Sequence, residues 1–178
     1  MTTLLGVDFI ETAVQRARRR FPTLTFATES IFSLGKKYRA QFDAVACLEV
    51  LYYVKTQERS AALRSLSGVL RRGGYAVFSS LIGPPPHFST GDFLDLIGSE
   101  FEIIAVETLH LRLVSFLEKA GSRLGRLIQR LDRPQAGSQP AYCLGRLPFS
   151  TVVTIEKWSR PLKGLSASHT IVLARVRV

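Results

Sequence analysis

The stretch that most constrains the fold is residues 41–80, where two short apolar runs flank a helical segment. The runs at 44–48 and 75–78 have the length and composition of buried parallel strands. Between them, Thr56 opens a predicted helix and Glu58 lies in its first turn. The apolar residues at helical spacing are Ala62, Leu63, Leu66, Val69 and Leu70. We expect Gly73 and Gly74 to end that helix, because glycine tolerates positive φ. Strand, helix, turn and strand make a βαβ unit with a right-handed crossover, which indicates an α/β fold.

The rest of the chain also alternates between short apolar runs and helical patterns. Strands are predicted at 4–7, 24–27, 101–111 and 169–178. Helices are predicted at 11–21 and from 89 or 90 to 97. Residues 36–41 read as a polar linker and residues 132–148 as a loop. The pattern at 151–158 fits a helix or a strand and does not decide between them. At 178 residues, the length suits one domain with a substantial core.

Positive charge is concentrated in the last third of the chain. The net charge is +10, and residues 111–178 hold 12 Lys or Arg against 3 Asp or Glu. Within that third, residues 112–131 read as a basic amphipathic helix, weakened by two glycines. This helix could cover the active site, lie on a membrane surface as a peripheral contact, or meet nucleic acid or an anionic substrate. Solvated surface charge is the alternative explanation.

Several classes of protein are disfavoured by what the sequence does not contain. No apolar run approaches the roughly 20 residues that span a bilayer, and the first residues do not form a secretory signal. Cys47 lies in a predicted buried strand and Cys143 in a predicted loop, without the spacing of metal ligands. We therefore expect reduced thiols, no metal site and a cytoplasmic location.

The pieces FDAVACLEVLYYV and LRSLSGVLRRGGYAVFSS together resemble the fourth strand, its helix and the fifth strand of class I S-adenosylmethionine-dependent methyltransferases. The resemblance implies a Rossmann-like sheet, mostly parallel, whose antiparallel last strand lies between the fifth and sixth strands. It also implies one methyltransferase-like domain over 1–178, with a basic helical insertion at 112–165 before the last strand. The implied cofactor is S-adenosylmethionine.

The resemblance also assigns cofactor contacts. Asp8, which closes the strand in LLGVDFIETAVQRARRRFP, would accept hydrogen bonds from the ribose hydroxyls, with Phe9 beside it. Helix N-cap is the alternative role for Asp8, and NAD-binding domains use the same acidic position. Glu29 would bind the adenine amino group, unless it faces solvent, with Ser30 flanking the ring. Leu48 and Glu49 would lie at the methionine end of the cofactor; alternatively, Glu49 binds substrate or caps the following turn.

Two residues are candidates for removing a proton from the methyl acceptor. His87 follows three prolines in the loop after the fifth strand of the family pattern, and imidazole titrates near neutral pH. Tyr52 lies in the loop after the fourth strand. An ordinary loop histidine and a packing tyrosine are the alternatives.

The family's first strand and its glycine-rich turn do not appear in the sequence, which starts at the second strand of the pattern. We expect a truncated chain; the alternatives are a partner chain that supplies the strand and a smaller sheet that no longer binds cofactor. The second and fourth strands of the pattern would then lack a shared neighbour.

The expected function is methyl transfer from S-adenosylmethionine to an O or N atom of a small molecule. The basic last third of the chain would suit an anionic methyl acceptor. A non-catalytic module that binds a membrane surface or nucleic acid is the second hypothesis, and NAD-dependent chemistry is the third.

Overall fold

The computed structural model describes residues 4–111, 116, 149–161 and 167–177. Its elements, in chain order, are β1 (Leu5–Asp8), α1 (Glu11–Arg20), β2 (Thr25–Thr28), α2 (Leu34–Lys37), β3 (Phe42–Leu48), two 3-10 turns (Leu51–Tyr53 and Thr56–Glu58), α3 (Arg59–Val69), β4 (Leu70–Leu81), α4 (Thr90–Glu100), β5 (Phe101–Leu109), α6 (Phe149–Ser159) and β6 (His169–Val176). The strands and long helices therefore lie close to the ranges that apolar periodicity predicts.

The strands form a sheet of the predicted kind. β3 and β4 run parallel, and β6 lies antiparallel between β4 and β5, in the order β3-β4-β6-β5. This confirms the Rossmann-like α/β fold with an antiparallel last strand inserted beside the fifth strand of the family pattern. The carboxyl ends of β3 and β4 point the same way, so the loops that follow them meet at one edge of the sheet.

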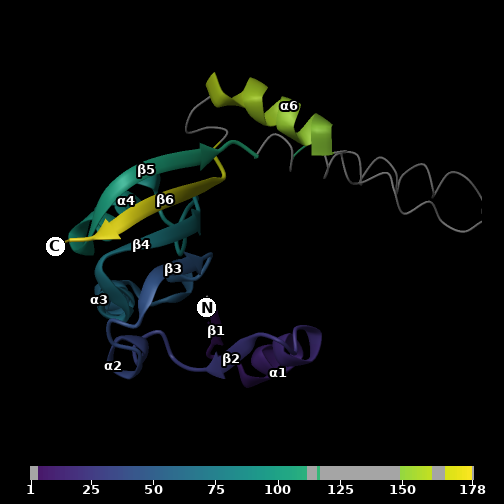
Figure 1. Cartoon of the computed structure of the whole chain (residues 1–178). Coiled ribbons are helices and arrows are strands. Elements are labelled where there is room, and N and C mark those ends of the chain that lie inside the picture. The colour runs from purple at the N-terminus through teal and green to yellow at the C-terminus, as the bar shows by residue number, and fades with distance from the viewer. Residues whose placement is uncertain (1–3, 112–115, 117–148, 162–166, 178) are drawn as a thin grey trace, which may run out of the picture.

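β1 and β2 form a separate parallel pair. Figure 1 shows this pair and α1 beside β3, at the opposite side of the molecule from β5. No hydrogen-bonded register joins β1 to β3 among the described residues. The prediction that these two strands lack a shared neighbour is therefore confirmed.

The core lies on one face of the four-stranded sheet, against α3 and α4. Burial alternates along β4. Ala76 and Phe78 face the core and are fully buried, while Tyr75 points to the other face of the sheet and is 47% exposed. Phe78 packs edge-on against Phe101, with ring centroids 5.1 Å apart. Cys47 also lies in this core, where burial raises the pKa of its thiol to about 12 and keeps it protonated.

Three local expectations are corrected or decided by the structure. The helix predicted to stop at Gly73 and Gly74 ends earlier, at Val69, and both glycines lie inside β4. Gly73 has a φ of +71°, and a Cβ on Gly74 would lie 3.1 Å from the Asp43 carbonyl oxygen, so both are needed at an irregular part of the strand.

The polar linker at 36–41 begins within α2, which packs against α3. The undecided segment 151–158 is helical, in α6.

Most of the basic segment at 112–131 and the predicted loop at 132–148 lie outside the described residues. The assignment of 112–165 as an insertion within one domain therefore stays a prediction. Within the described ranges, no helix combines the length and apolar character that crossing a bilayer requires.

Candidate functional site

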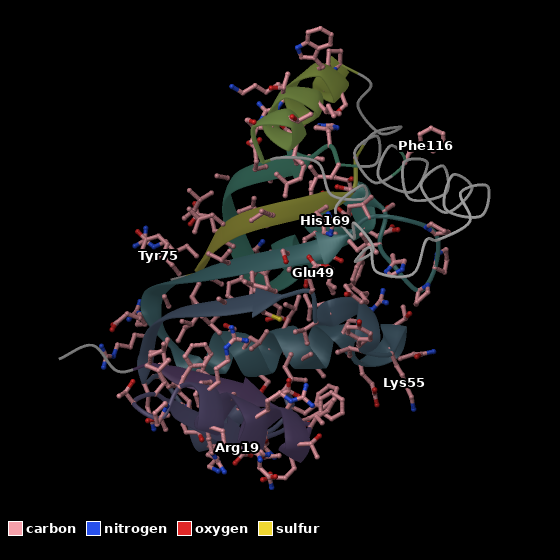
Figure 2. The ribbon with its side chains drawn as sticks, turned by 90° about the vertical axis from the view of Figure 1, so that its right-hand side faces the viewer. Arg19, Glu49, Lys55, Tyr75, Phe116 and His169 are labelled. Atoms are coloured by element: carbon pink, nitrogen blue, oxygen red, sulfur yellow. The ribbon has the colours of Figure 1, made fainter. Side chains whose placement is uncertain are left out.

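A pocket of about 540 Å³ is built from the segments that follow β3 and β4. Its wall includes aromatic rings, two cationic side chains and one carboxylate: Tyr52, Tyr53, His87, Phe88, Lys55, Arg59 and Asp92. Figure 2 shows Glu49 and Lys55 towards the end of the molecule to which the β4 arrow points, with Tyr75 towards the other end. Ligands of open α/β sheets bind outside the carboxyl ends of the strands, so this is where a small substrate is expected.

The structure brings the two predicted catalytic residues together. The rings of Tyr52 and His87 pack edge to face, with centroids 5.0 Å apart. Nδ1 of His87 is buried and has no hydrogen-bond partner among the described residues. An unpartnered buried nitrogen is costly, because it has lost water without gaining a protein partner.

Tyr52 is held as a neutral phenol. Its hydroxyl lies 3.5 Å from the hydroxyl of Tyr53, and this contact, with burial and the charge of Glu49, raises the pKa of Tyr52 to about 12. A phenol with such a pKa stays protonated at neutral pH. A protonated phenol suits hydrogen bonding to a ligand, once its O–H turns from Tyr53, better than removal of a proton.

Arg59, which was not singled out in the sequence, fastens the two walls of the pocket together. Its guanidinium donates to the carbonyl oxygens of Val54 (3.1 Å) and Pro86 (2.9 Å). It also stacks over the Phe88 ring at 4.0 Å. Because Val54 follows β3 and Pro86 follows β4, one side chain sets the spacing between the two loops. Burial lowers the pKa of Arg59, as expected for a partly desolvated cation.

Glu49 locks the carboxyl ends of β3 and β4. Its carboxylate accepts hydrogen bonds from Ser79 Oγ (2.7 Å) and the Leu81 N–H (3.0 Å), and its own N–H donates to the Ser79 carbonyl (3.1 Å). Its φ is +58°, a conformation that costs about 1–3 kcal/mol for a residue other than glycine. These contacts join Glu49 to β4, whereas the turn that follows it, Leu51–Tyr53, has no side-chain cap. Each carboxylate oxygen can accept a second hydrogen bond, so ligand contact is still possible.

Asp8 and Glu29 lie side by side at the carboxyl ends of β1 and β2. The Glu29 N–H donates to the Asp8 carbonyl at 3.0 Å. One Asp8 carboxylate oxygen accepts from the Ile10 N–H at 2.9 Å, and the other accepts nothing from the described residues. Asp8 is thus not the N-cap of α1, which is Ile10. Glu29 pairs with Lys37, which lowers the pKa of its carboxyl group, and accepts from Ser33 at 3.2 Å.

The other predicted cofactor residues surround these acids or lie on β3. Phe9 is 74% exposed next to Asp8, and Ser30 is exposed after β2, where its hydroxyl accepts from the Phe32 N–H. Leu48 is 53% exposed at the end of β3. The residues present fit the adenosine half of the cofactor, because a free carboxylate oxygen at Asp8 matches a ribose hydroxyl. The two groups of residues nevertheless belong to two separate sheets.

Sequence reasoning missed several polar groups near Glu49. Ser79 donates a hydrogen bond to its carboxylate. His169, on β6, is the register partner of Leu81 on β4, and the Leu81 N–H donates to the same carboxylate. Figure 2 shows His169 close to Glu49 at this end of the sheet. The available signal was weak: a polar residue at the first position of a predicted strand. Among the described residues, no cluster of three or more His, Cys, Asp or Glu could hold a metal ion.

A family model described as a methyltransferase domain matches residues 1–78. That range contains β1, β2, β3, α3 and most of β4. It includes Asp8, Glu29 and Glu49, but not His87. A comparison with curated proteins finds no match.

Solved structures with a similar fold include enzymes of different chemistry. The [4+2]-cyclase SpnF is 18% identical, with a TM-score of 0.61, and the alignment covers 99% of this chain and 66% of the cyclase. The N-methyltransferase NodS from Bradyrhizobium japonicum, solved with S-adenosyl-L-homocysteine, is 13% identical, with a TM-score of 0.55 and coverages of 99% and 67%. The N1-methyltransferase for 1,6-didemethyltoxoflavin from Burkholderia thailandensis is 13% identical, with a TM-score of 0.56 and coverages of 98% and 61%.

This chain thus spans about two thirds of the length of these structures. At such low identity the similarity shows the fold. The family model covers residues 1–78, less than half of the chain, and it agrees with the parallel arrangement of β3 and β4. The chain therefore has the fold of S-adenosylmethionine-dependent methyltransferases, and its first 78 residues are similar to a methyltransferase domain.

Proposed function

We propose that this protein transfers a methyl group from S-adenosylmethionine to an O or N atom of a small molecule bound in the pocket between the β3 and β4 loops. The observation that carries this proposal is the pairing of His87 with Tyr52 in a pocket of about 540 Å³ next to Glu49. When bound, the cofactor supplies a methyl group on a sulfonium, which is a good leaving group. The protein therefore has mainly to position the acceptor and remove its proton.

The chain's own residues divide these tasks. His87 takes the acceptor's proton, because its ring lines the pocket beside Tyr52. Tyr52 donates a hydrogen bond that orients the acceptor, since its raised pKa keeps the phenol protonated. Asp8 binds the ribose, Glu29 and Ser30 lie around the adenine, and Leu48 and Glu49 face the other end of the cofactor.

The pocket favours a planar acceptor with negative charge. Aromatic rings from Tyr52, Tyr53 and Phe88 form much of its wall, and Lys55 and Arg59 place two cations against the single carboxylate of Asp92. Arg59 is already bound to two carbonyl oxygens, so the exposed Lys55 is the group that would attract an anion.

Calorimetric titration with S-adenosylhomocysteine tests the cofactor assignment. We expect Asp8→Ala to weaken binding by about tenfold or more, because a ribose hydroxyl loses its charged acceptor. Asp43→Ala is the matched control: Asp43 is also an exposed acid on a strand, but it pairs with Arg71 at the other end of β3. Equal affinities of Asp8→Ala and the unaltered chain would contradict the assignment, as would a folded chain that does not bind.

Turnover with a panel of hydroxylated and amino aromatic acids tests the catalytic assignment. We expect His87→Gln to lower kcat by about a hundredfold, because the group that takes the acceptor's proton is lost. Tyr52→Phe should mainly raise KM, because orientation is lost while the base remains. A kcat that His87→Gln leaves unchanged would exclude His87 as the base.

A further inference from the structure

His169, the first residue of β6, lies at the same edge of the sheet as the carboxyl end of β4. Its register partner is Leu81, whose N–H donates to the Glu49 carboxylate at 3.0 Å. Figure 2 shows His169 and Glu49 close together at this end of the sheet. The His169 ring is half-buried, and the roles assigned to His87 and Tyr52 leave it without one.

The hydroxyl of Ser168, the residue before His169, is surrounded by three hydrogen-bonding groups. Ser168 Oγ accepts from the Leu111 N–H at 3.1 Å, and it lies 3.0 Å from the Leu109 carbonyl oxygen and 3.0 Å from His169 Nδ1. The Ser168 backbone is fixed as well, because its N–H donates to the Leu109 carbonyl and its carbonyl accepts from the Ile82 N–H, both at 2.8 Å. The hydroxyl therefore has a fixed place beside the imidazole ring.

These contacts decide which nitrogen of His169 carries the hydrogen. A serine hydroxyl has one hydrogen to donate and two lone pairs that accept. If its hydrogen points to the Leu109 carbonyl, all three contacts form, and Nδ1 of His169 then has to donate to Ser168 Oγ. If the hydrogen points to Nδ1 instead, the bond to the Leu109 carbonyl is lost. The arrangement with more hydrogen bonds places the ring hydrogen on Nδ1 and leaves Nε2 as a bare acceptor.

Nε2 of His169 is open to a ligand. It has no hydrogen-bond partner in the part of the chain that the structure describes. The described side-chain atoms that are both buried and unpartnered are His87 Nδ1 and Thr170 Oγ1, so Nε2 is not sealed in the core. Beside it, each oxygen of the Glu49 carboxylate accepts one hydrogen bond and has room for another. Two neighbouring acceptors fit a ligand group that donates.

His87 lies close to His169 along the same stretch of backbone. A Cβ on Gly83 would lie 3.6 Å from Cδ2 of His87, and Gly83 is two residues beyond Leu81, the partner of His169. The bond from the Ile82 N–H to the Ser168 carbonyl keeps this stretch beside the start of β6. Two residues of extended chain span about 7 Å. That length is comparable with a benzene ring and its substituent.

We propose that His169 is a second binding residue for the methyl acceptor. Its Nε2 accepts a hydrogen bond from an O–H or N–H group of the acceptor, and Ser168 holds the ring in the tautomer that allows this. An acceptor that reaches from His87 to His169 is an aromatic ring with two polar substituents, one that is methylated and one that donates to Nε2. The ligand rests on the proposed methyl transfer, whereas the tautomer does not.

Nitrogen NMR of the 178-residue chain with ¹⁵N-labelled imidazole rings tests the tautomer in the free protein. The sequence has three histidines, so His87→Gln, His110→Gln and His169→Gln assign every signal. At about pH 8.5, above the range in which imidazole ordinarily titrates, we expect the hydrogen of His169 on Nδ1. A bare Nδ1 in the unaltered chain would overturn the proposal.

Two serine variants test the cause of that tautomer. Ser168→Ala removes the acceptor of Nδ1–H and should shift the ratio of the two tautomers toward Nε2–H by about fivefold or more. Ser80→Ala is the control, because Ser80 is also buried but bonds to the Leu81 carbonyl, and it should leave the ratio unchanged. The same ratio in Ser168→Ala and the unaltered chain would contradict the positioning role of Ser168.

Titration with protocatechuate, a dihydroxylated benzoate, in the presence of S-adenosylhomocysteine tests the ligand. We expect the Nε2 signal of His169 to move, because Nε2 accepts a hydrogen bond. Veratrate, the dimethyl ether of the same acid, has no hydroxyl to donate and should leave the signal in place. If His87 responds to protocatechuate and His169 does not, the role of His169 fails and the proposed function stands. If neither histidine responds, both fail.

Two substitutions of His169 separate its contact with Ser168 from its contact with ligand. The amide of His169→Asn reaches the position of Nδ1 but places nothing at Nε2, whereas the amide oxygen of His169→Gln reaches the position of Nε2. We expect His169→Asn to raise the Kd and KM for protocatechuate by about tenfold, with kcat changed by less than about threefold, and His169→Gln to raise them less. Unchanged Kd and KM in His169→Asn would overturn the proposal.

Discussion

The two sheets of this molecule differ in how firmly their residues are held. In the four-stranded sheet and the two helices packed on it, α3 and α4, the fully buried residues include Phe78, Phe101, Leu63, Phe93 and Ile97. Among residues 4–30, which include β1, α1 and β2, Val14 alone is buried. Since stability comes mostly from buried apolar surface, the small unit should open more easily than the large one. The candidate pocket lies on the firm part, and Asp8 and Glu29 lie on the weakly packed part.

This difference has a consequence for the site. A pocket wall fastened by Arg59 and Glu49 can hold a ligand without rearranging, because its hydrogen bonds already exist in the free protein. Asp8 and Glu29 are fixed to each other by a backbone hydrogen bond but not to β3. On the proposed assignment of Asp8 and Glu29 to the cofactor, binding across both parts would have to order the smaller one, which would reduce the affinity.

The largest expected effect comes from removing a buried ring. Phe78→Ala should lower the free energy of unfolding by about 3–5 kcal/mol, because it leaves a cavity beside Phe101.

Val14→Ala should lower the free energy of unfolding by about 1–2 kcal/mol and should increase hydrogen exchange in β1, α1 and β2 alone. Chemical denaturation with regional exchange measures both. A uniform increase across both sheets in Val14→Ala would show that the two parts unfold together.

The next effect concerns the lock between β3 and β4. Glu49→Ala should lower the free energy of unfolding by about 1–3 kcal/mol, because Ser79 Oγ and the Leu81 N–H lose their acceptor. Glu49→Gln keeps an acceptor oxygen and should cost less. Glu58→Ala is the control, since Glu58 is an exposed glutamate close by in the chain and should change stability by less than about 0.5 kcal/mol. Equal costs of Glu49→Ala and Glu58→Ala in thermal denaturation would refute the lock.

A smaller effect is expected from the fastening of the pocket loops. Arg59→Lys should cost about 1 kcal/mol, because an ammonium cannot reproduce the two-carbonyl contact and the stacking on Phe88. Exchange should increase at residues 84–88 in particular. Arg64→Lys, on the same helix and paired with Glu100, is the control and should leave those residues unchanged. Unchanged exchange at 84–88 in Arg59→Lys would mean that other contacts hold the loop.

The smallest effect is the pH dependence of the Glu29–Lys37 pair. The hydrogen bond from Lys37 lowers the pKa of Glu29 in the folded state, so the pair stabilises above the unfolded pKa of about 4.3. That contribution is lost as the pH falls through the lower folded value. We expect Lys37→Met to flatten the fall in melting temperature below about pH 5, and Lys36→Met, the exposed neighbour, to leave it unchanged. Identical acid profiles of both variants would show that the pair contributes nothing.

Much of the fold could be predicted because its signals are local. Apolar periodicity located β3, α3, α4 and β6, and resemblance to the family placed β6 between β4 and β5. The same resemblance assigned Asp8 and Glu29 to the cofactor, and the structure joins the two residues through a backbone hydrogen bond. Their roles toward cofactor stay predictions. The helix end at Val69 was misjudged, because glycines inside an irregular strand look like glycines that end a helix.

The sequence by itself determined the order of strands and helices, the faces that they bury and the residue types available after each strand. These properties follow from the side-chain period of each element, which is encoded within a few residues. Tertiary structure alone decided that Arg59 joins two loops and that Glu49 binds β4 with a positive φ. Each of these depends on segments that are distant in the chain and meet only when the sheets form.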